Sequence, residues 1–375
     1  MPARHRIAAA AAAGAITALG LTATPAAVAQ PVGSTAYLSQ FSKITTVTST
    51  VPGNGDVNPY GIVVIPRSTG RLQAGNVLIS NFNNKSNLQG TGKTIVQITP
   101  SGHRTLFAQL NPGKLPGSCP GGVGLSTALE VLPGGWVIVG SVPSVNGMAA
   151  TAKAGCLIVL NSNGQVKETI SGDGINGPWD SAAVVRGRFA TLFVANVLDG
   201  TVAAGGNVVD NGYVLRLTLR LHPLAPPSVV ASTVVGSGYP QRTDLMAFVI
   251  GPTGLGLGRH GTLYVAEALT NRIFAIPNAV ARRRTAGEGT LVTKGGKLNM
   301  PLGLAIAPGG HVLTVNGGNG KIVETTPAGD QISSRFLDTS GFPAGAGALF
   351  GLAVQPGLGG VYYVDDAANT LRLLH

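Results

Sequence analysis

The stretch GTLYVAEALTNRIFAIP, residues 261–277, has a counterpart near the end of the chain, GVYYVDDAANTLRLL, residues 360–374. Each stretch has an apolar run, a polar corner with an acid and an Asn, and then a second apolar run. Short apolar, β-branched runs joined by such corners are typical of paired β-strands. The same strand, corner and strand therefore occur at least twice, which indicates a repeat protein.

Ahead of each of these stretches lies another apolar run, in its clearest copies of the form Pro-x-Gly followed by aliphatic residues. It occurs six times, as PYGIVVIP from Pro59, STALEVLP from Ser126, PWDSAAVV from Pro178, PTGLGLG from Pro252, PLGLAIAP from Pro301 and LFGLAVQP from Leu349. Self-similarity at a spacing of about 50 residues is typical of solenoids, propellers and arrays. Second, third and fourth apolar runs follow each copy, except that the last copy lacks the fourth.

An unassigned apolar run, KITTVTSTV at residues 43–51, precedes the first copy. It can supply the missing outer strand of the last copy and close a ring, which leaves only short, protected sheet edges. The sequence therefore predicts an all-β fold, a six-bladed β-propeller of four-stranded antiparallel blades, as a single domain over residues 30–375. The predicted blades begin near residues 58, 125, 177, 251, 300 and 348.

The first 29 residues have the form of an export signal, because Arg4 and Arg6 precede an apolar run and small residues at 27–29 suit cleavage. The apolar run, residues 7–21, is shorter than the roughly 20 residues that span a bilayer. We therefore expect a secreted monomer, extracellular or associated with the cell envelope, without a membrane span. Cys119 and Cys156 are the only cysteines, and export to an oxidising compartment predicts a disulfide between them.

The net charge of the chain does not identify its binding partner. Without residues 1–29 the chain keeps 24 Lys and Arg against 15 Asp and Glu, a net charge of +9. The one dense basic cluster, residues 282–284, has no interleaved aromatic residue, and nucleic-acid binders concentrate basic charge along one face. We therefore expect no nucleic-acid partner. Arg outnumbers Lys 17 to 9, and Ala and Gly are abundant, which indicates a bacterial source.

The repeated pattern resembles the NHL repeat, and residues 252–273, 301–322 and 349–371 carry it best. The resemblance implies a six-bladed propeller distantly similar to the gluconolactonase and regucalcin-like superfamily. Such propellers place metals over the central channel, on the face with the corners between second and third strands and the loops into each first strand. The family includes binding modules and enzymes, so the resemblance leaves both open.

Eight polar or aromatic side chains are predicted to surround that channel mouth. They are Tyr60, Asn81, Trp179, Asp180, Asn196, Glu267, Asn316 and Asp366. Asn and Asp also stabilise turns by bonding nearby backbone, so each corner has a purely structural explanation, and Trp179 can equally pack in the core. Glu267, Asp366 and Asp180 together resemble a hard-cation site, because calcium takes six to eight oxygen ligands. Calcium is thus the candidate cofactor.

We expect a secreted propeller that binds a small molecule, a glycan, or a protein or wall partner through its channel face. The alternative is a calcium-dependent lactonase or hydrolase of the gluconolactonase-like type, with Asp180, Glu267 or Asp366 as base. His260 and His311 fall in turns on the opposite face, which disfavours a zinc lyase with imidazole ligands. Glu130, within the first strand of the second blade, is predicted to lie too deep for a role to be assigned.

Overall fold

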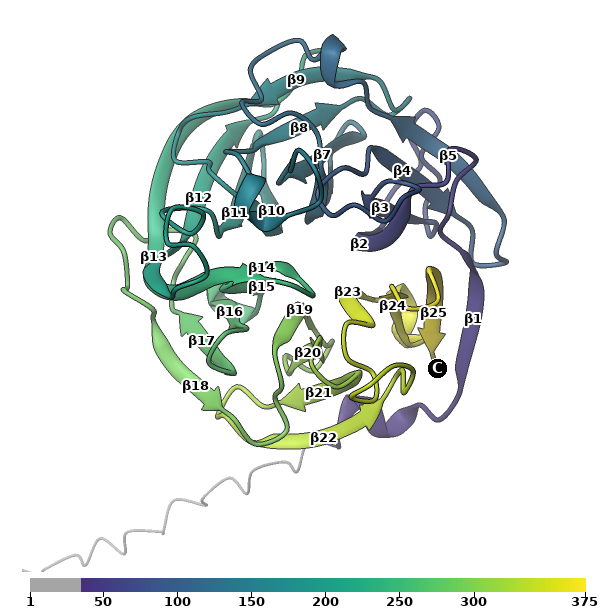
Figure 1. Cartoon of the computed structure of the whole chain (residues 1–375), viewed down its shortest axis with the longest axis vertical. Coiled ribbons are helices and arrows are strands. Elements are labelled where there is room, and N and C mark those ends of the chain that lie inside the picture. Colours follow the sequence, from purple (N-terminus) through teal and green to yellow (C-terminus); the bar gives the residue numbers. More distant parts are fainter. Residues whose placement is uncertain (1–34) are drawn as a thin grey trace, which may run out of the picture. The chain divides into compact units, whose positions relative to one another are not determined.

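Six antiparallel sheets follow one another along the chain, and each begins with one of the six repeated runs. The computed structural model describes residues 35–375, which form one compact unit. Figure 1 shows the sheets arranged as blades around a central axis, a six-bladed β-propeller. The predicted fold class is confirmed, whereas the export signal predicted at residues 1–29 lies outside the described residues.

Each blade runs from an innermost first strand to an outermost fourth strand. The first strands are β2 (Val57–Val64), β6 (Leu125–Leu132), β10 (Pro178–Arg186), β15 (Pro252–Leu257), β19 (Pro301–Ile306) and β23 (Leu349–Val354). The second strands are β3 (Val77–Asn83), β7 (Trp136–Ser141), β11 (Phe189–Asn196), β16 (Leu263–Glu267), β20 (Val312–Asn316) and β24 (Val361–Asp365). The third strands are β4 (Thr94–Ile98), β8 (Cys156–Leu160), β12 (Val209–Arg220), β17 (Arg272–Ile276), β21 (Lys321–Thr325) and β25 (Thr370–Leu374). The fourth strands are β5 (Arg104–Gln109), β9 (Val166–Ile170), β13 (Ser228–Asp244), β18 (Thr290–Lys294), β22 (Gln331–Phe336) and β1 (Ile44–Ser49).

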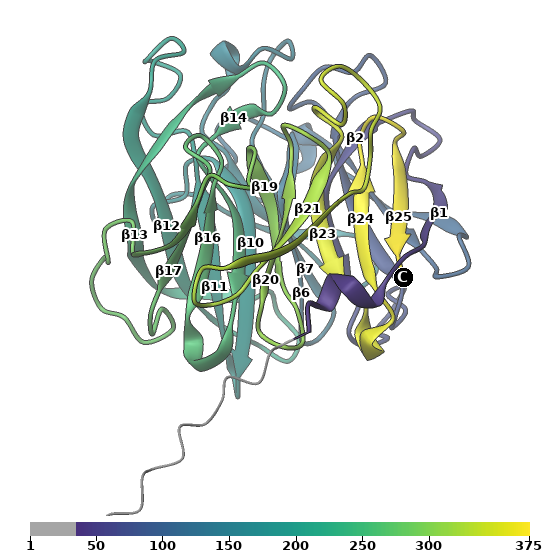
Figure 2. The ribbon, with the colours of Figure 1, turned by 90° about the horizontal axis from the view of Figure 1, so that it is seen from below.

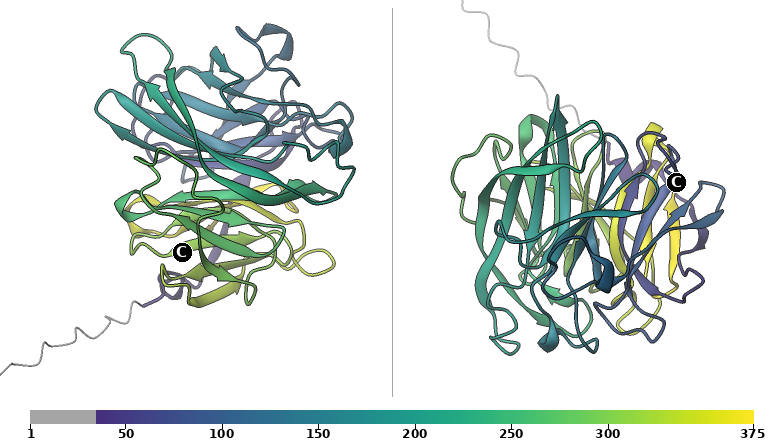
Figure 3. Two further views of the ribbon diagram at one scale, coloured as in Figure 1. Left: turned by 90° about the vertical axis from the view of Figure 1, so that its left-hand side faces the viewer. Right: turned by 90° about the horizontal axis from the view of Figure 1, so that it is seen from above.

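The third blade departs from the four-stranded pattern. Its outer strand β13 has 17 residues and continues into a fifth, short strand, β14 (Phe248–Ile250). Figure 3 shows the long β12 and β13 ribbons, teal to green, crossing the side of the molecule. Because β14 returns toward the axis (Figure 1), this blade brings an extra apolar segment to one end of the channel.

The repeated glycine of the first strands is explained by close contact between neighbouring blades. A Cβ on Gly303 would lie 2.1 Å from the backbone oxygen of Phe350 in the next blade. A Cβ on Gly351 would lie 2.3 Å from the backbone oxygen of Tyr60, which joins the last blade to the first. Only glycine fits where the backbones of adjacent first strands approach this closely.

The two ends of the channel differ in the chain segments that surround them (Figure 2). We call one the corner face, because it carries the corners between second and third strands and the segments leading into each first strand. The other is the hairpin face, which carries the turns between first and second strands and between third and fourth strands. Antiparallel pairing within every blade fixes this assignment.

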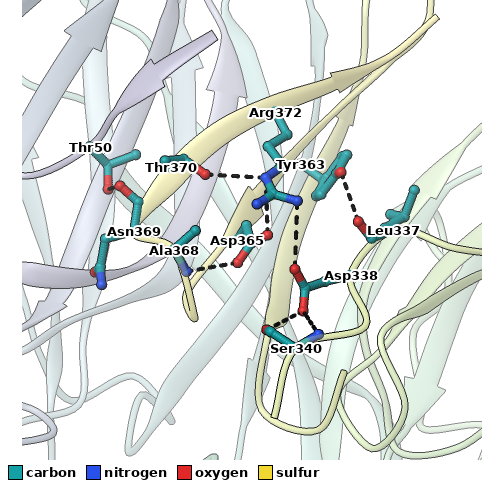
Figure 4. Close-up of polar contacts among 10 residues, drawn as sticks. All are labelled: Thr50, Leu337, Asp338, Ser340, Tyr363, Asp365, Ala368, Asn369, Thr370 and Arg372. Carbon is teal, nitrogen blue, oxygen red and sulfur yellow. Dashed lines mark hydrogen bonds and ion pairs between the residues drawn. The ribbon is translucent and has the colours of Figure 1, made fainter. Parts of the chain in front are cut away.

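The ring closes through the predicted pairing of the two chain ends. Strand β1 pairs antiparallel with β25, from Ile44 opposite Leu374 to Ser49 opposite Thr370. Arg372 of β25 also bonds Asp365 at 3.1 Å and Asp338 of the preceding blade segment at 3.5 Å (Figure 4). Closure therefore rests on the strand pairing, while the largely buried ion pairs tie the last blade to the segment that follows β22.

The short 3₁₀ helix η1 (Tyr37–Gln40) precedes β1 and is held by a buried carboxylate. The backbone N–H groups of Tyr37 and Leu38 each donate to Glu324 at 2.8 Å. Glu324 also bonds the Nδ1 atom of His311 at 2.6 Å. The further 3₁₀ helices are η2 (Pro112–Lys114), η3 (Ala149–Thr151), η4 (Arg259–Gly261) and η5 (Pro356–Leu358). No helix within residues 35–375 is long and apolar enough to cross a membrane.

The predicted disulfide is present. Cys119 and Cys156 are bonded, with an S–S distance of 2.07 Å and Cα atoms 5.2 Å apart. The bond ties the loop that leads into β6 to the start of β8 in the same blade. Cys156 lies in an apolar cluster that also holds Ile95 of the first blade and Val137 of the second, so the bond adjoins a packed interface between blades.

Candidate functional site

The six first strands surround a cavity of about 480 Å³ on the propeller axis. Its lining is mainly aliphatic, from residues such as Ile62, Leu129, Leu304 and Leu352. The lining continues to Pro66 and Pro356, which are exposed and lie beyond the ends of β2 and β23. The cavity therefore opens toward the hairpin face, and its volume is within the range of about 300–1,000 Å³ that small-molecule sites have.

Two carboxylic acids, Glu130 on β6 and Asp180 on β10, line this cavity. Among the described residues of the lining they are the charged ones, with Thr127 and Ser181 as nearby hydroxyls. Burial raises the pKa of Glu130 to about 8, and the neighbouring Asp180 carboxylate adds to the rise. Burial also raises the pKa of Asp180 to about 7, against hydrogen bonds from the Leu255 and Ser181 backbone. Near neutral pH the pair therefore retains a proton.

Asp180 occupies the position that is glycine in four of the six first strands. Its Oδ2 atom accepts the backbone N–H of Leu255, in the next blade, at 2.8 Å. The side chain thus bonds the neighbouring blade at a point where other blades meet through glycine. This bond fixes the carboxyl group at the cavity wall, so the residue serves the blade interface and the cavity together.

Tyr60 and Trp179 lie in an aromatic cluster between the cavity and the corner face. Tyr60 stacks on Phe350 at 3.9 Å and on Phe82 at 4.4 Å between ring centroids, and Trp179 meets both Tyr60 and Phe82 edge to face. Phe248 of β14 packs on Phe82 at 5.4 Å. All five rings are almost completely buried. We call them the aromatic plug, and the ligand-binding role expected of Tyr60 and Trp179 stays a prediction.

The predicted amide residues Asn81, Asn196 and Asn316 are fully buried at the corners. Asn81 Nδ2 donates to the Thr50 backbone oxygen at 3.2 Å. Asn196 Oδ1 accepts the Asn176 backbone N–H at 3.0 Å, and Asn316 Nδ2 donates to the Lys297 backbone oxygen at 2.8 Å. Each amide thus bonds the backbone of a segment leading into a first strand or closing the ring.

Glu267 is fully buried as well, and its carboxylate binds its own corner. Its oxygens accept the backbone N–H groups of Leu269 at 2.7 Å and Thr270 at 3.1 Å, and the Thr270 hydroxyl. Burial raises the pKa of Glu267 to about 7, while these hydrogen bonds and Arg272 oppose the rise. Glu267 performs the turn-stabilising role that was expected of Asn or Asp.

The strand register changes one predicted equivalence. In the fourth blade the first residue of the first strand, Pro252, pairs with the corner residue Glu267, and in the last blade the first residue, Leu349, pairs with Asp365. Asp365, rather than Asp366, is thus the counterpart of Glu267. Its Oδ1 atom accepts the Ala368 backbone N–H at 3.0 Å (Figure 4). Asp366 follows it, partly buried, with its pKa raised to about 7 by burial and by Asp365.

The residues proposed for calcium do not fit a shared site. Within residues 35–375, no three His, Cys, Asp or Glu side chains form a group that could hold a metal ion. Glu267 uses both oxygens in its own turn, and Asp180 lines the cavity beyond the aromatic plug. Calcium binding by Glu267, Asp366 and Asp180 stays a prediction, which thermal melts in chelator and in millimolar calcium would test.

The sequence assigned no role to Glu130, which the structure places at the cavity wall beside Asp180. One signal was available, since an acid within an otherwise aliphatic first strand is costly unless it faces solvent or a ligand. The sequence contains no comparable signal that the cavity opens on the hairpin face. It follows from the aromatic plug, which depends on side-chain directions in three blades and on β14.

No family model matches the chain, and no curated protein matches it. Solved structures do match over most of its length. A gluconolactonase from Xanthomonas campestris shares 12% identity over 88% of each chain, with a TM-score of 0.51. A streptogramin B lyase shares 14% identity over 89% of this chain and 97% of its own, with a TM-score of 0.52. The calcium-binding protein regucalcin from Agrobacterium tumefaciens shares 12% identity over 89% and 93%, with a TM-score of 0.53. At these identities the likeness shows the fold.

Proposed function

We propose that the protein binds a small molecule in the channel cavity through Glu130 and Asp180. The observation that carries the proposal is the pair of acids in a cavity whose other lining side chains are mainly aliphatic. A ligand with an aliphatic body and a cationic or hydrogen-bond-donating group would match both features, because buried carboxyl groups need partners. The glycan and protein ligands expected from the sequence are larger than this cavity accommodates in full.

A series of alkylamines from butylamine to octylamine tests this proposal, with alkyl carboxylates of equal length as the comparison. Amines that occupy the cavity should raise the melting temperature in a concentration-dependent way, whereas the carboxylates should not. The variants Glu130→Gln and Asp180→Asn should lose the effect. Asp330→Asn, which removes an exposed acid from the hairpin face, is the matched control and should keep it. Equal shifts for amines and carboxylates would contradict the proposal.

Lactone hydrolysis is the second candidate, favoured by two carboxylic acids that line one cavity. At pH 7 a protonated Glu130 can donate to a leaving oxygen, while an ionised Asp180 can accept a proton from attacking water. The likeness in fold to a gluconolactonase makes a lactone the substrate to try first. Hydrolysis of glucono-δ-lactone above the uncatalysed rate, lost in Glu130→Gln and in Asp180→Asn, would support this candidate.

We also propose that the protein acts outside the cytoplasm as a monomer of bacterial origin with NHL-like repeats. The disulfide supports an oxidising compartment. The short apolar run after Arg4 and Arg6 supports export. Fractionation of a cell that expresses the full chain, with mass measurement of the released protein, tests export and cleavage before Gln30 together.

A further inference from the structure

The hairpin face carries most of the arginines of the described chain, although the sequence spaces them widely. They are Arg67, Arg71, Arg104, Arg186, Arg188, Arg220, Arg259, Arg282, Arg283 and Arg284, each in or beside a turn of that face. Many lysines lie instead in or beside segments of the corner face, namely Lys85, Lys114, Lys153, Lys297 and Lys321. Folding therefore concentrates guanidinium groups at one end of the propeller.

Part of this arginine-rich face is a groove of about 1000 Å³ beside the third blade. Arg186, Arg188, Arg220 and His222 line it together with Phe189. The remaining lining residues are Pro133, Gly134, Gly187, Leu221 and Pro223, so the described lining contains no acid. We call this feature the arginine groove.

Strand pairing sets the spacing of the groove's side chains. Arg186 of β10 pairs with Phe189 of β11, and Phe189 pairs in turn with Arg220 of β12. Directly paired residues project from the same side of a sheet, about 5 Å apart. The Arg220 guanidinium carbon lies 5.9 Å from the centroid of the Phe189 ring, which remains 41% exposed. Two guanidinium groups thus flank one accessible aromatic ring.

Other arginines of the hairpin face hydrogen-bond to neighbouring residues, whereas the side chains of the groove arginines do not. Arg71 donates to three backbone oxygens, and Arg104 donates to the Ser49 oxygen. The side chains of Arg186 and Arg188 have no hydrogen-bond or ion-pair partner within residues 35–375, and both are exposed. Their donors are free for an external ligand with planar oxygen pairs, which guanidinium groups bind in a bidentate manner.

We propose that the arginine groove binds an acidic polysaccharide, with carboxylates on Arg186, Arg188 and Arg220 and a sugar ring on Phe189. A groove suits an extended chain, and the flanking arginines match charges repeated along it. A single exposed ring suits one sugar face, whereas single-stranded nucleic acid binds to several aromatic platforms in succession. This surface is separate from the channel cavity, so the proposal stands independently of the proposed function.

Binding of the full chain to immobilised polygalacturonate tests the proposal. The triple variant Arg186→Gln, Arg188→Gln, Arg220→Gln should lose affinity about tenfold or more and show a weaker dependence on salt, because charged hydrogen bonds are removed. The matched control Lys85→Gln, Lys114→Gln, Lys153→Gln removes the same charge from the corner face and should change affinity little. Phe189→Ala, with all charges kept, should weaken binding without weakening the salt dependence.

Three outcomes would overturn the proposal. Equal losses in the two triple variants would mean that only net charge matters. If the unaltered chain did not bind polygalacturonate at low salt, acidic polysaccharides would be excluded as the ligand. Tighter binding of single-stranded DNA or poly(glycerol phosphate) than of polygalacturonate would assign the groove to phosphate polymers. Circular dichroism and melting temperature establish that each variant is folded, which is expected because these side chains are exposed.

Discussion

Asn369 of the last blade accepts the backbone N–H of Asn58, in the first blade, at 2.7 Å. Asn271 of the fourth blade makes the same contact with Met300, in the fifth, at 2.5 Å. Both asparagines have positive φ, 52° and 57°, which Asn tolerates better than most residues. The repeated Asn therefore closes its own corner and fixes the start of the next blade's first strand.

This double role predicts graded effects of substitution at Asn271. Asn271→Gly keeps the backbone conformation and loses the hydrogen bond to Met300, so it should cost about 1 kcal/mol. Asn271→Ala also loses the hydrogen bond, and Ala tolerates the left-handed region less well than Asn or Gly, so this variant should cost about 1 kcal/mol more than Asn271→Gly. Urea unfolding of both variants measures the difference. An Ala variant as stable as the Gly variant would show that the backbone conformation contributes nothing.

The disulfide predicts a loss of stability on reduction. Cys119 and Cys156 are 37 residues apart, and closing a loop of that length should stabilise the protein by about 3–4 kcal/mol in the chain-entropy model. The double variant Cys119→Ala, Cys156→Ala should show this loss in urea unfolding, and dithiothreitol should not lower its stability further. If the unaltered chain showed two free thiols under native conditions, the bond would be absent in solution.

Shortened chains distinguish the contribution of η1 to stability from the contribution of β1 to ring closure. A chain that begins at residue 43 loses η1, which leaves the buried Glu324 without the Tyr37 and Leu38 donors. A chain that begins at residue 51 also loses β1 and exposes the edge of β25. We expect a lower melting temperature for the first and aggregation in addition for the second, because open strand edges pair with other chains. Light scattering distinguishes them, and a soluble second chain would contradict the closure.

The sequence was sufficient for the architecture because the repeat is a local pattern with a physical cause. A glycine at the third position of the run marks each clear first strand, since this glycine must let two backbones meet, as Gly303 and Gly351 show. The weaker copies could still be placed by spacing. The fifth strand β14 could not be predicted, because it belongs to a single blade and no other copy repeats it.

The functional site was harder to predict from the sequence than the fold, because it depends on where individual side chains point after folding. The sequence predicts that the corner residues line a channel mouth, whereas in the structure Glu267 and the corner amides bond their own surroundings. Tyr60 and Trp179 fill the axis because Phe82 and Phe248 come from other strands to meet them. Asp180 was predicted at the mouth on the corner face, whereas the structure places it in the cavity that opens toward the hairpin face. Charge on the hairpin face was missed, because its arginines come together only on folding.

The acid pair in the cavity predicts a particular pH dependence of stability. The folded pKa of Glu130, about 8, lies above its ordinary value of 4.5. Between these values the folded state holds a proton that the unfolded state has released, so the free energy of unfolding falls as pH rises. One such group contributes at most about 1.4 kcal/mol per pH unit.

Glu130→Gln removes this linkage while keeping the size of the side chain. We therefore expect the stability of the variant relative to the unaltered protein to increase from pH 5 to pH 8, because only the unaltered protein has to ionise a partly buried acid. Urea unfolding at intervals of half a pH unit measures it. Asp330→Asn is the control, since Asp330 is exposed on the hairpin face and should leave the pH profile unchanged. Parallel profiles for Glu130→Gln and the unaltered protein would mean that Glu130 titrates as it does in water, and that the cavity is fully hydrated around it.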